Sequence, residues 1–398
     1  MKHIAITPRL LETHVPNLGV GLWAAHAPGN DTLAAQLDAL GPGHVDLLVD
    51  IRIDDELDTL ARLLALLRPR ESPLWLYLIC DDDAPKLGLA RLAEILRTEA
   101  KGISGALLTP AAYLNSYQPD GEWPSTTTPA QLIKQARQYW PNLLIGGGFP
   151  TYFTELNRCR PDPSTIDFLT HATSPIVHAA DDVSVMETLE SLPWIFESAR
   201  AIAPGQPYRI TTSAVGAWTN PYGQSITPNA NRERVTLSDN DPRQHALFAA
   251  AWSVGYLAEA IGHVDALTLS SIGHPFPIAG PTARYPIFDA LRGLNAGAGR
   301  PAIGVTEPVK GLAALGWQTD DERGEFWLAN VTDEPCAVTV AGTRCAAVLD
   351  EHADSSASAL RDWRLDRLSS WNESPLTLAP YATARLEIAL AEPLVHST

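Results

Sequence analysis

Four residues in the middle of the sequence have side chains suited to proton transfer: Glu155, His171, His178 and Asp181. Carboxylates and imidazoles can take a proton from water or return one to a leaving group near neutral pH. We assign Glu155 or Asp181 as a base, and His171 or His178 as a donor or acid. The types and spacing of these residues therefore indicate general acid/base chemistry.

Further polar and aromatic side chains follow apolar segments of the sequence and are suited to a ligand with many hydroxyl groups. Asn157 and Arg158 follow Glu155 closely in the sequence. Their side chains offer hydrogen-bond donors and an acceptor to a ligand. The other candidates for substrate binding are Asp50, Arg52, Tyr113, Asn115, Asn220, Tyr222 and His274.

The catalytic candidates also have purely structural interpretations. Asp181 and Asp182 precede an S-x-x-E capping box at 184–187, so one of them, Asp182 before Asp181, would favour the positive end of a helix. Glu155 would otherwise be a carboxylate on a surface helix, and His171 a packed, hydrogen-bonded histidine. Both interpretations stay open at the level of the sequence.

The hydrophobic pattern predicts the elements that position these residues. Stretches with helical periodicity alternate with eight short apolar runs typical of buried strands. The apolar runs are Leu18–Trp23, Val45–Ile53, Leu74–Ile79, Ile103–Leu108, Leu143–Ile145, Phe168–Thr173, Tyr208–Val215 and Val264–Leu269. The helical stretches include Asp31–Leu40, Glu56–Leu67, Leu87–Leu96 and Gln131–Tyr139. This alternation within the first 300 residues or so predicts parallel βαβ units and a (β/α)8 barrel.

A barrel also predicts where the site lies. Residues just after the strands of such a barrel face its active site, and adjacent parallel strands lie about 4.8 Å apart. We therefore expect Glu155, His171 and Asp181 to converge at the ends of the fifth and sixth strands. Glu155 reaches this position only if the segment 149–153 folds back over the barrel mouth.

The pattern changes after the small-residue segment Asn295–Gly304. Apolar and polar residues then alternate with turn signals between them, as over Leu376–Leu390. A period of two residues predicts antiparallel strands. We therefore expect the barrel to span residues 1–297 and a C-terminal β-sandwich to span residues 303–398.

The strand ends disfavour one common mechanism. Most barrel glycosidases that retain configuration need two carboxylates, one after the fourth strand and one after the seventh. Here these strands end in Leu108-Thr-Pro110 and Thr212-Ser-Ala-Val-Gly216, which contain no carboxylate. The sequence also contains no HExxH, GxSxG, Walker A or GxGxxG motif. No spacing of histidines and aspartates requires a metal, and we expect neither a metal nor another cofactor.

Composition limits the partners and the location of the protein. The formal charge of −17 argues against a nucleic-acid partner, because such a field repels phosphates. The N-terminal residues lack the apolar core of a secretory signal, and no apolar run approaches the roughly 18 residues that span a bilayer. The four cysteines lack CxxC spacing, which favours reduced thiols. We therefore expect a cytoplasmic protein without membrane contact; a homo-oligomer stays open.

Several segments resemble the D-apionate lactonase family. They are GGGFPTYFTELNR, DFLTHATSPIVHAADDVSVMETLESLPWIFESARAI, PYRITTSAVGAWTNPYG and DPRQHALFAAAWSVGYLA. The resemblance is clearest in the barrel from Gly146 onward and less specific in the C-terminal β domain. It implies that the chain opens D-apionolactone, the lactone of a branched-chain sugar acid, in apiose catabolism. Family members usually carry an additional N-terminal β domain, which we expect to be missing because this chain begins almost directly at the barrel.

Three functions are compatible with these features. The first is a sugar-lactone hydrolase, in which a base activates water and polar groups bind the hydroxyls of a small carbohydrate or sugar lactone. The second is a glycoside hydrolase with an atypical carboxylate pair, such as Glu155 with Asp181. The third is a non-catalytic carbohydrate-binding barrel. The resemblance favours the lactonase.

Overall fold

The structure is a computed structural model that divides into two compact units. It describes residues 2–70, 72–99, 102–117, 121–223, 225–280, 283–351, 369–370 and 375–390. The first unit, here called the barrel unit, comprises Asn17–Gln244 and His263–Ile278. The second, here called the sheet unit, comprises Met1–Pro16, His245–Gly262 and Ala279–Thr398.

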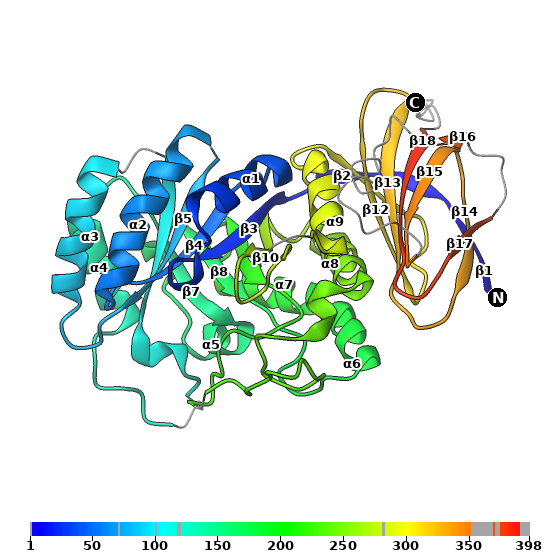
Figure 1. Cartoon of the computed structure of the whole chain (residues 1–398). Helices are drawn as coiled ribbons and strands as arrows, with labels where there is room; N and C mark the ends of the chain where they lie inside the picture. Colours follow the sequence, from blue (N-terminus) through cyan, green and yellow to red (C-terminus); the bar gives the residue numbers. More distant parts are fainter. Residues whose placement is uncertain are drawn as a thin grey trace. The chain divides into compact units, whose positions relative to one another are not determined.

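The barrel unit contains a closed barrel of parallel strands (Figure 1), which confirms the predicted (β/α)8 fold. The strands are β3 (Asn17–Trp23), β4 (Val45–Asp50), β5 (Leu74–Cys80), β6 (Ile103–Pro110), β7 (Leu144–Tyr152), β8 (Phe168–Ala172), β9 (Tyr208–Ser213) and β10 (Ala266–Ile272). They pair in chain order, and β10 closes the ring onto β3. Nearly all of their residues are buried, as expected for strands that are covered on both faces.

Helices connect the strands of this unit. They are α1 (Asn30–Leu40), α2 (Asp54–Leu67), α3 (Pro85–Glu99), α4 (Pro129–Tyr139), α5 (Phe153–Arg158), α6 (Asp182–Glu187) and α7 (Leu192–Ile202). Short 3₁₀ helices occur at η1 (Ala24–His26), η2 (Arg68–Arg70), η3 (Ala111–Leu114), η4 (Pro163–Thr165), η5 (Thr188–Ser191) and η6 (Pro242–His245). In α2, the buried leucines at 57, 60, 64 and 67 form the apolar stripe that packs against the strands. Helix α4 begins with a capping box between Thr128 and Gln131.

The interior of the barrel is filled by a polar network. Asp46 lies 3.3 Å from the guanidinium of Arg209 and accepts a 2.7 Å hydrogen bond from the Thr268 hydroxyl. His44 contacts the same hydroxyl at 2.8 Å, and Arg209 stacks over Trp75 at 3.7 Å. Burial raises the pKa of the Asp46 carboxyl, and Arg209 opposes this change. The barrel axis is therefore packed, and ligands must bind at the carboxyl ends of the strands.

The sheet unit contains two β-sheets. One has the order β1 (Lys2–Ile6), β14 (Cys336–Val340) and β17 (Leu376–Leu378). The other has the order β16 (Ser369–Ser370), β15 (Thr343–Leu349), β18 (Thr383–Ala389), β13 (Arg323–Asn330), β12 (Leu312–Gln318), β11 (Pro301–Val305) and β2 (Pro8–His14). The second sheet pairs antiparallel throughout, as the period of two residues predicts.

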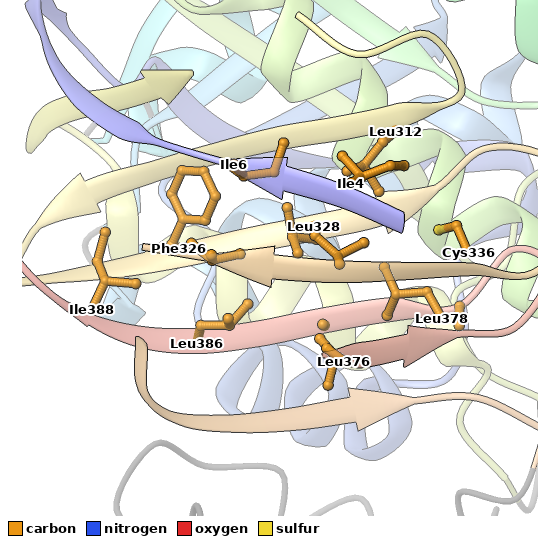
Figure 2. Packing of buried hydrophobic residues seen from close by; sticks show 14 of the residues in the cluster. Ile4, Ile6, Leu312, Phe326, Leu328, Cys336, Leu376, Leu378, Leu386 and Ile388 are labelled. Carbon is orange, nitrogen blue, oxygen red and sulfur yellow. The ribbon is translucent and has the colours of Figure 1, made fainter. Parts of the chain in front are cut away.

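Apolar side chains from both sheets form one core (Figure 2). Ile4 and Ile6 come from the first sheet, and Phe326, Leu328 and Ile388 come from the second. All five are less than 10 % exposed. Because this core joins the two sheets face to face, the unit has the sandwich architecture expected for the C-terminal part.

The observed units differ from the predicted division at residues 297 and 303. Strand β1 pairs with β14, and β2 pairs with β11, so residues 2–14 belong to the sheet unit. Helices α8 (Leu247–Ala260) and α9 (Pro286–Leu294) also belong to it, and η7 (Asn295–Gly297) follows α9. Helix α8 is apolar on nearly all sides and packs against β12 and β13. An all-round apolar helix needs cover on every face, and the sheet supplies part of it.

Candidate active site

Glu155 caps helix α5. Its carboxylate accepts a 3.0 Å hydrogen bond from the backbone N–H of Tyr152 and another from the Ser116 hydroxyl. The residue is only 3 % exposed. Burial raises the pKa of this carboxyl, and the hydrogen bonds and the charge of Arg158 oppose the rise. Residues 149–152 continue β7 and Phe153 begins α5, whose first turn holds Glu155 as a buried, structural carboxylate.

His171 is buried in β8. Its Nδ1 lies 2.8 Å from the carbonyl oxygen of Ala172, and its Nε2 lies 2.6 Å from the Tyr208 hydroxyl. A proton on Nδ1 that is donated to the carbonyl leaves Nε2 to accept from Tyr208. Burial lowers the pKa of His171 to about 4. Its ring also packs beside Phe153 at 5.5 Å. These contacts match the packed, hydrogen-bonded interpretation.

Asp181 and His178 lie on the loop that follows β8. Asp181 is the N-cap of α6 and accepts a 2.9 Å hydrogen bond from Ser184 N–H, which lowers the pKa of its carboxyl. The cap is therefore Asp181 and not Asp182. His178 is exposed, with its ring 6.5 Å from that of Tyr222. Among the described residues, Glu155, His171 and Asp181 each have separate hydrogen-bond partners, and no hydrogen bond joins one of them to another.

The predicted binding residues after β4 form a pair. Asp50 ends the strand, and its two carboxylate oxygens accept hydrogen bonds of 2.8 and 2.6 Å from Arg52. Glu56, in the first turn of α2, accepts a 2.8 Å hydrogen bond from the Asp50 backbone N–H. The Arg52 side chain is 41 % exposed, so its remaining donors face solvent. This pair can bind a hydroxyl or a carboxylate at the barrel mouth.

The other predicted binding residues are spread over several loops. Asn220 accepts from the Tyr222 backbone N–H at 3.1 Å and donates to the Ser225 carbonyl at 3.3 Å. Asn157 is exposed and accepts a 2.6 Å hydrogen bond from Arg160. Two more lie at or after η3: Tyr113 is buried, and Asn115 is half-buried. Most of these side chains stabilise loops.

His274 is the predicted residue whose position best suits acid/base chemistry. Its Nε2 lies 2.9 Å from the Asp239 Oδ2. The ring of His26 stands perpendicular to that of His274, with the centroids 4.7 Å apart. Burial lowers the pKa of His26, and the neighbouring His274 lowers it further. His26 follows β3, the first strand, and His274 follows β10, the last, so both lie where the barrel closes.

Backbone contacts position the two histidines. The turn after β10 is closed by Ser271, whose N–H donates to the Phe276 carbonyl at 2.8 Å and whose hydroxyl accepts from the Phe276 N–H at 2.9 Å. Gly273 within this turn has φ +79°. A Cβ atom at Gly273 would lie 2.9 Å from the His26 carbonyl oxygen. Glycine therefore permits the close approach that places His26 beside His274.

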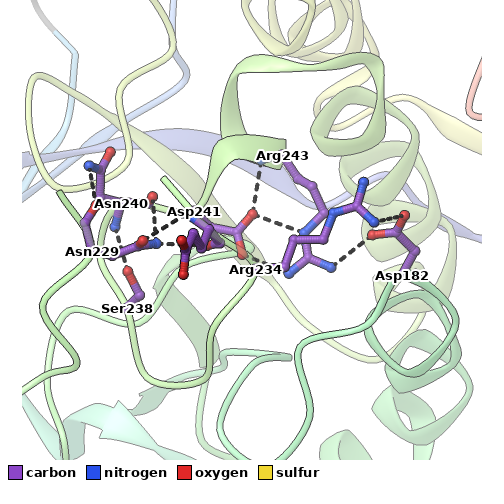
Figure 3. Close-up of polar contacts among 8 residues, drawn as sticks. Asp182, Asn229, Arg234, Ser238, Asn240, Asp241 and Arg243 are labelled. Carbon is purple, nitrogen blue, oxygen red and sulfur yellow. Dashed lines mark hydrogen bonds and ion pairs between the residues drawn. The ribbon is translucent and has the colours of Figure 1, made fainter. Parts of the chain in front are cut away.

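A second network holds the loop that carries Asp239 (Figure 3). The Asn229 side chain donates to the carbonyls of Glu233 at 2.7 Å and Asn240 at 3.1 Å, and Asn240 donates back to the Asn229 carbonyl at 3.0 Å. Ser238, which precedes Asp239, accepts from the Asn240 N–H at 3.1 Å. Hydrogen bonds thus hold the loop on both sides of Asp239.

Charged contacts tie the same loop to the start of α6. The Arg243 guanidinium donates two hydrogen bonds to Asp241, of 2.9 and 2.6 Å, and lies 3.1 Å from Asp182. Arg234 also pairs with Asp182, at 2.9 Å (Figure 3). Asp182 therefore anchors the loop through two arginines. A stiff loop fixes the position of the Asp239 carboxylate against His274 without a large entropy cost at each turnover.

Three aromatic side chains pack together near the ends of β3 and β10. Trp23 makes edge contacts with Trp218 at 6.2 Å and with Phe276 at 5.8 Å between ring centroids. Beneath Trp23 and Trp218 only a cavity of about 10 Å³ remains, which is room for about one water molecule. A sugar-sized ligand does not fit into this cavity.

This arrangement can activate water. If His274 donates its Nε2 proton to Asp239, Nδ1 keeps a lone pair that can take a proton from water. The carboxylate fixes the tautomer and stabilises the imidazolium that forms. Among the described residues, no group of three or more His, Cys, Asp or Glu side chains could hold a metal ion.

Sequence reasoning missed His26 and Asp239. His26 follows directly after the apolar run that forms β3, so the rule for strand ends could have found it. Asp239 lies 26 residues after the end of β9 at Ser213, in a loop without periodicity. Its only signal is the turn-forming segment Ser-Asp-Asn-Asp-Pro at 238–242, which predicts a turn and not a partner for His274.

The closed barrel and its rim, together with the β-sandwich, define a TIM-barrel protein with a C-terminal β domain. Residues 18–299 match the TIM barrel domain of D-apionate lactonase, and residues 310–386 match its C-terminal immunoglobulin-like domain. The chain belongs to the D-apionate lactonase family.

The D-apionate lactonase of Brucella anthropi is 36 % identical to this chain over 262 residues. The match covers 63 % of this chain and 42 % of that protein, so the chain spans less than half the length of the curated relative it matches.

Solved structures share the architecture. One is a GH30 endoxylanase from Clostridium papyrosolvens C71, with a TM-score of 0.59 and 8 % identity over 98 % of this chain and 100 % of that chain. Another is a GH39 enzyme from Xanthomonas axonopodis pv. citri, with a TM-score of 0.57 and 12 % identity over 98 % of this chain and 97 % of that chain. Identities this low show the fold alone. No described helix is long and apolar enough to cross a membrane.

Proposed function

We propose that this chain hydrolyses the lactone of a sugar acid as a step of apiose catabolism. Its main substrate in this proposal is D-apionolactone. The observation that carries the proposal is the pair of His274 and Asp239, 2.9 Å apart, with the ring of His26 beside His274. Family membership supplies the substrate class. We also keep the predictions of a cytoplasmic location and of no nucleic-acid partner.

In the proposed reaction, His274 acts as the base. Its Nδ1 takes a proton from water, and the water oxygen bonds to the lactone carbonyl carbon to give a tetrahedral oxyanion. When this intermediate collapses, the ring C–O bond breaks and the leaving alkoxide takes the proton from the imidazolium of His274. Asp239 holds the ring, and His26, kept neutral by its lowered pKa, binds a hydroxyl of the substrate.

The glycosidase alternative has weaker support. Strands β6 and β9 end at Pro110 and Ser213, where the corresponding catalytic carboxylates of many barrel glycosidases would follow. Glu155 is buried and its carboxylate accepts from the Tyr152 N–H at the start of α5. Asp181 is the N-cap of α6. Neither therefore stands ready to flank a glycosidic bond.

A panel assay tests the proposal. The purified chain is incubated with D-apionolactone, other aldonolactones and aryl glycosides, each with and without a chelator. We expect lactone opening, followed as acid release, and no cleavage of aryl glycosides. Cleavage of an aryl glycoside at a rate above that of lactone opening would favour the glycosidase and reject this proposal.

A further inference from the structure

A cavity in the barrel unit is lined by none of the residues of the histidine cluster. It has a volume of about 470 Å³, within the range of small-molecule sites. Its walls come from β6, β7, the start of α4 and the segment after α5. The residues that the argument uses are Tyr113, Trp123, Gly147, Phe149, Arg158 and Arg160.

A short helix and three glycines shape the wall of this cavity. Helix α5 has six residues, so the chain after β7 covers little of that strand before it returns through 159–167. Strand β7 contributes three consecutive glycines, 146–148, to the lining, where Cβ atoms would lie 2.4 Å from Phe168, 2.7 Å from Ile166 and 2.0 Å from the Thr170 carbonyl oxygen. A Cβ atom at Gly147 would lie 2.8 Å from Pro161, so only glycine lets that segment pack this closely.

One wall of the cavity is aromatic. Tyr113 stacks on Trp123 with ring centroids 5.7 Å apart and planes 21° from parallel, and it lies parallel to Phe149 at 6.5 Å. Trp123 is half-buried, so part of its ring is free to contact a ligand. Flat aromatic surfaces of this kind pack against the apolar C–H face of a sugar ring.

Two arginines line another part of the cavity. Arg158 donates to the Ser116 hydroxyl, and Arg160 donates to the Asn157 carbonyl and side-chain oxygens at 3.2 and 2.6 Å. The charge of Arg158 also acts on the buried Glu155 carboxyl, and the carboxylate Asp162 lines the same cavity, so Arg160 is the guanidinium better placed for a ligand. Guanidinium groups bind carboxylates through two parallel hydrogen bonds.

We propose that this cavity is a second ligand site, which binds a cyclic sugar carboxylate such as a uronic acid. The sugar ring lies against the half-buried Trp123, which Tyr113 supports from behind, and the carboxylate meets Arg158 and Arg160. The site is separate from the histidine cluster and does not depend on the proposed lactonase activity.

Calorimetric titration of the full chain with D-glucuronate tests the site, with D-glucose and acetate as ligands that lack the carboxylate or the ring. We expect binding of D-glucuronate and much weaker binding of both controls. Arg160→Gln and Trp123→Ala should each weaken the affinity by about tenfold or more. Arg160→Lys and Trp123→Phe keep the charge and the aromatic face and should lose less. Lactone turnover should stay unchanged in the Arg160 and Trp123 variants.

Three results would overturn the proposal. One is the absence of D-glucuronate binding at millimolar concentration. A second is an unchanged affinity in both Arg160→Gln and Trp123→Ala, with thermal unfolding showing that each is folded. The third is loss of binding in His274→Asn, which would place the ligand at the histidine cluster. Failure of the lactonase assay alone leaves the binding result standing.

Discussion

Two sides of the barrel rim carry similar residue types and use them differently. After β7 and β8, Glu155, His171 and Asp181 are each engaged in capping or packing. Where β10 meets β3, His26 and His274 are at least partly exposed, and Asp239 pairs with one of them. Residue type alone therefore does not distinguish a catalytic group from a structural one; exposure and the partner do.

Apart from substitution of His274 itself, the largest expected effect is that of substituting Asp239. Asp239→Asn removes the charge that orients His274 and stabilises its protonated form. We expect kcat/KM for the lactone to fall about a thousandfold. The melting temperature should stay close to that of the wild type, because the loop is held by Asn229 and Arg243. A decrease of less than threefold would remove Asp239 from the mechanism.

The next largest effect concerns stability: the buried His171 makes the free energy of unfolding depend on pH. Its pKa is 6.5 in the unfolded chain and about 4 when buried. Between these values the unfolded chain binds more protons, so the free energy of unfolding falls as the pH decreases. This histidine alone should cost about 3 kcal/mol between pH 7 and pH 4. Urea unfolding of the wild type and His171→Gln checks this, and parallel pH curves for the two proteins would contradict it.

Glu155 should affect stability more than turnover. Glu155→Ala removes the acceptor of the buried Tyr152 N–H and should lower the free energy of unfolding by about 2 kcal/mol. Glu155→Gln keeps an acceptor and should retain most of both stability and kcat/KM. If Glu155 were instead the base considered from the sequence, Glu155→Gln would lose about a hundredfold, the scale of one acid/base group. Measured turnover of this variant decides between the two assignments.

The smallest effect is expected at Asp181. Asp181→Asn keeps a good N-cap, whereas Asp181→Ala does not. The alanine variant should melt about 2 °C lower than the asparagine variant, with equal kcat/KM. A large loss of turnover in Asp181→Asn would return this residue to the catalytic machinery.

Much of the barrel was predictable from the sequence. The runs of apolar residues mark β3 to β6 within two residues at most ends, because a buried parallel strand must be apolar on both faces. Strand β7 extends to Tyr152 through three glycines, which have no strand preference, so the pattern ended too early at Ile145. Residues 2–14 pair with β14 and β11, far away in the sequence, and no local pattern encodes such a partner.

The candidate site was less predictable. Both His274 and His171 stand at the end of a predicted strand, so the sequence did not separate them. The environment of His171 depends on Tyr208 and Phe153. Asp239, which pairs with His274, lies in a long loop that contacts of Asn229, Arg234 and Arg243 hold in place (Figure 3). Contacts of this kind follow from the tertiary fold and have no spacing signature.

The most direct test compares kcat/KM for D-apionolactone in His274→Asn and Glu155→Gln, each checked for folding by its thermal unfolding. If the rim at β10 and β3 carries the chemistry, His274→Asn loses about a thousandfold or more and Glu155→Gln stays within about threefold of the wild type. The reverse order, with His274→Asn active and Glu155→Gln inactive, would contradict the central claim.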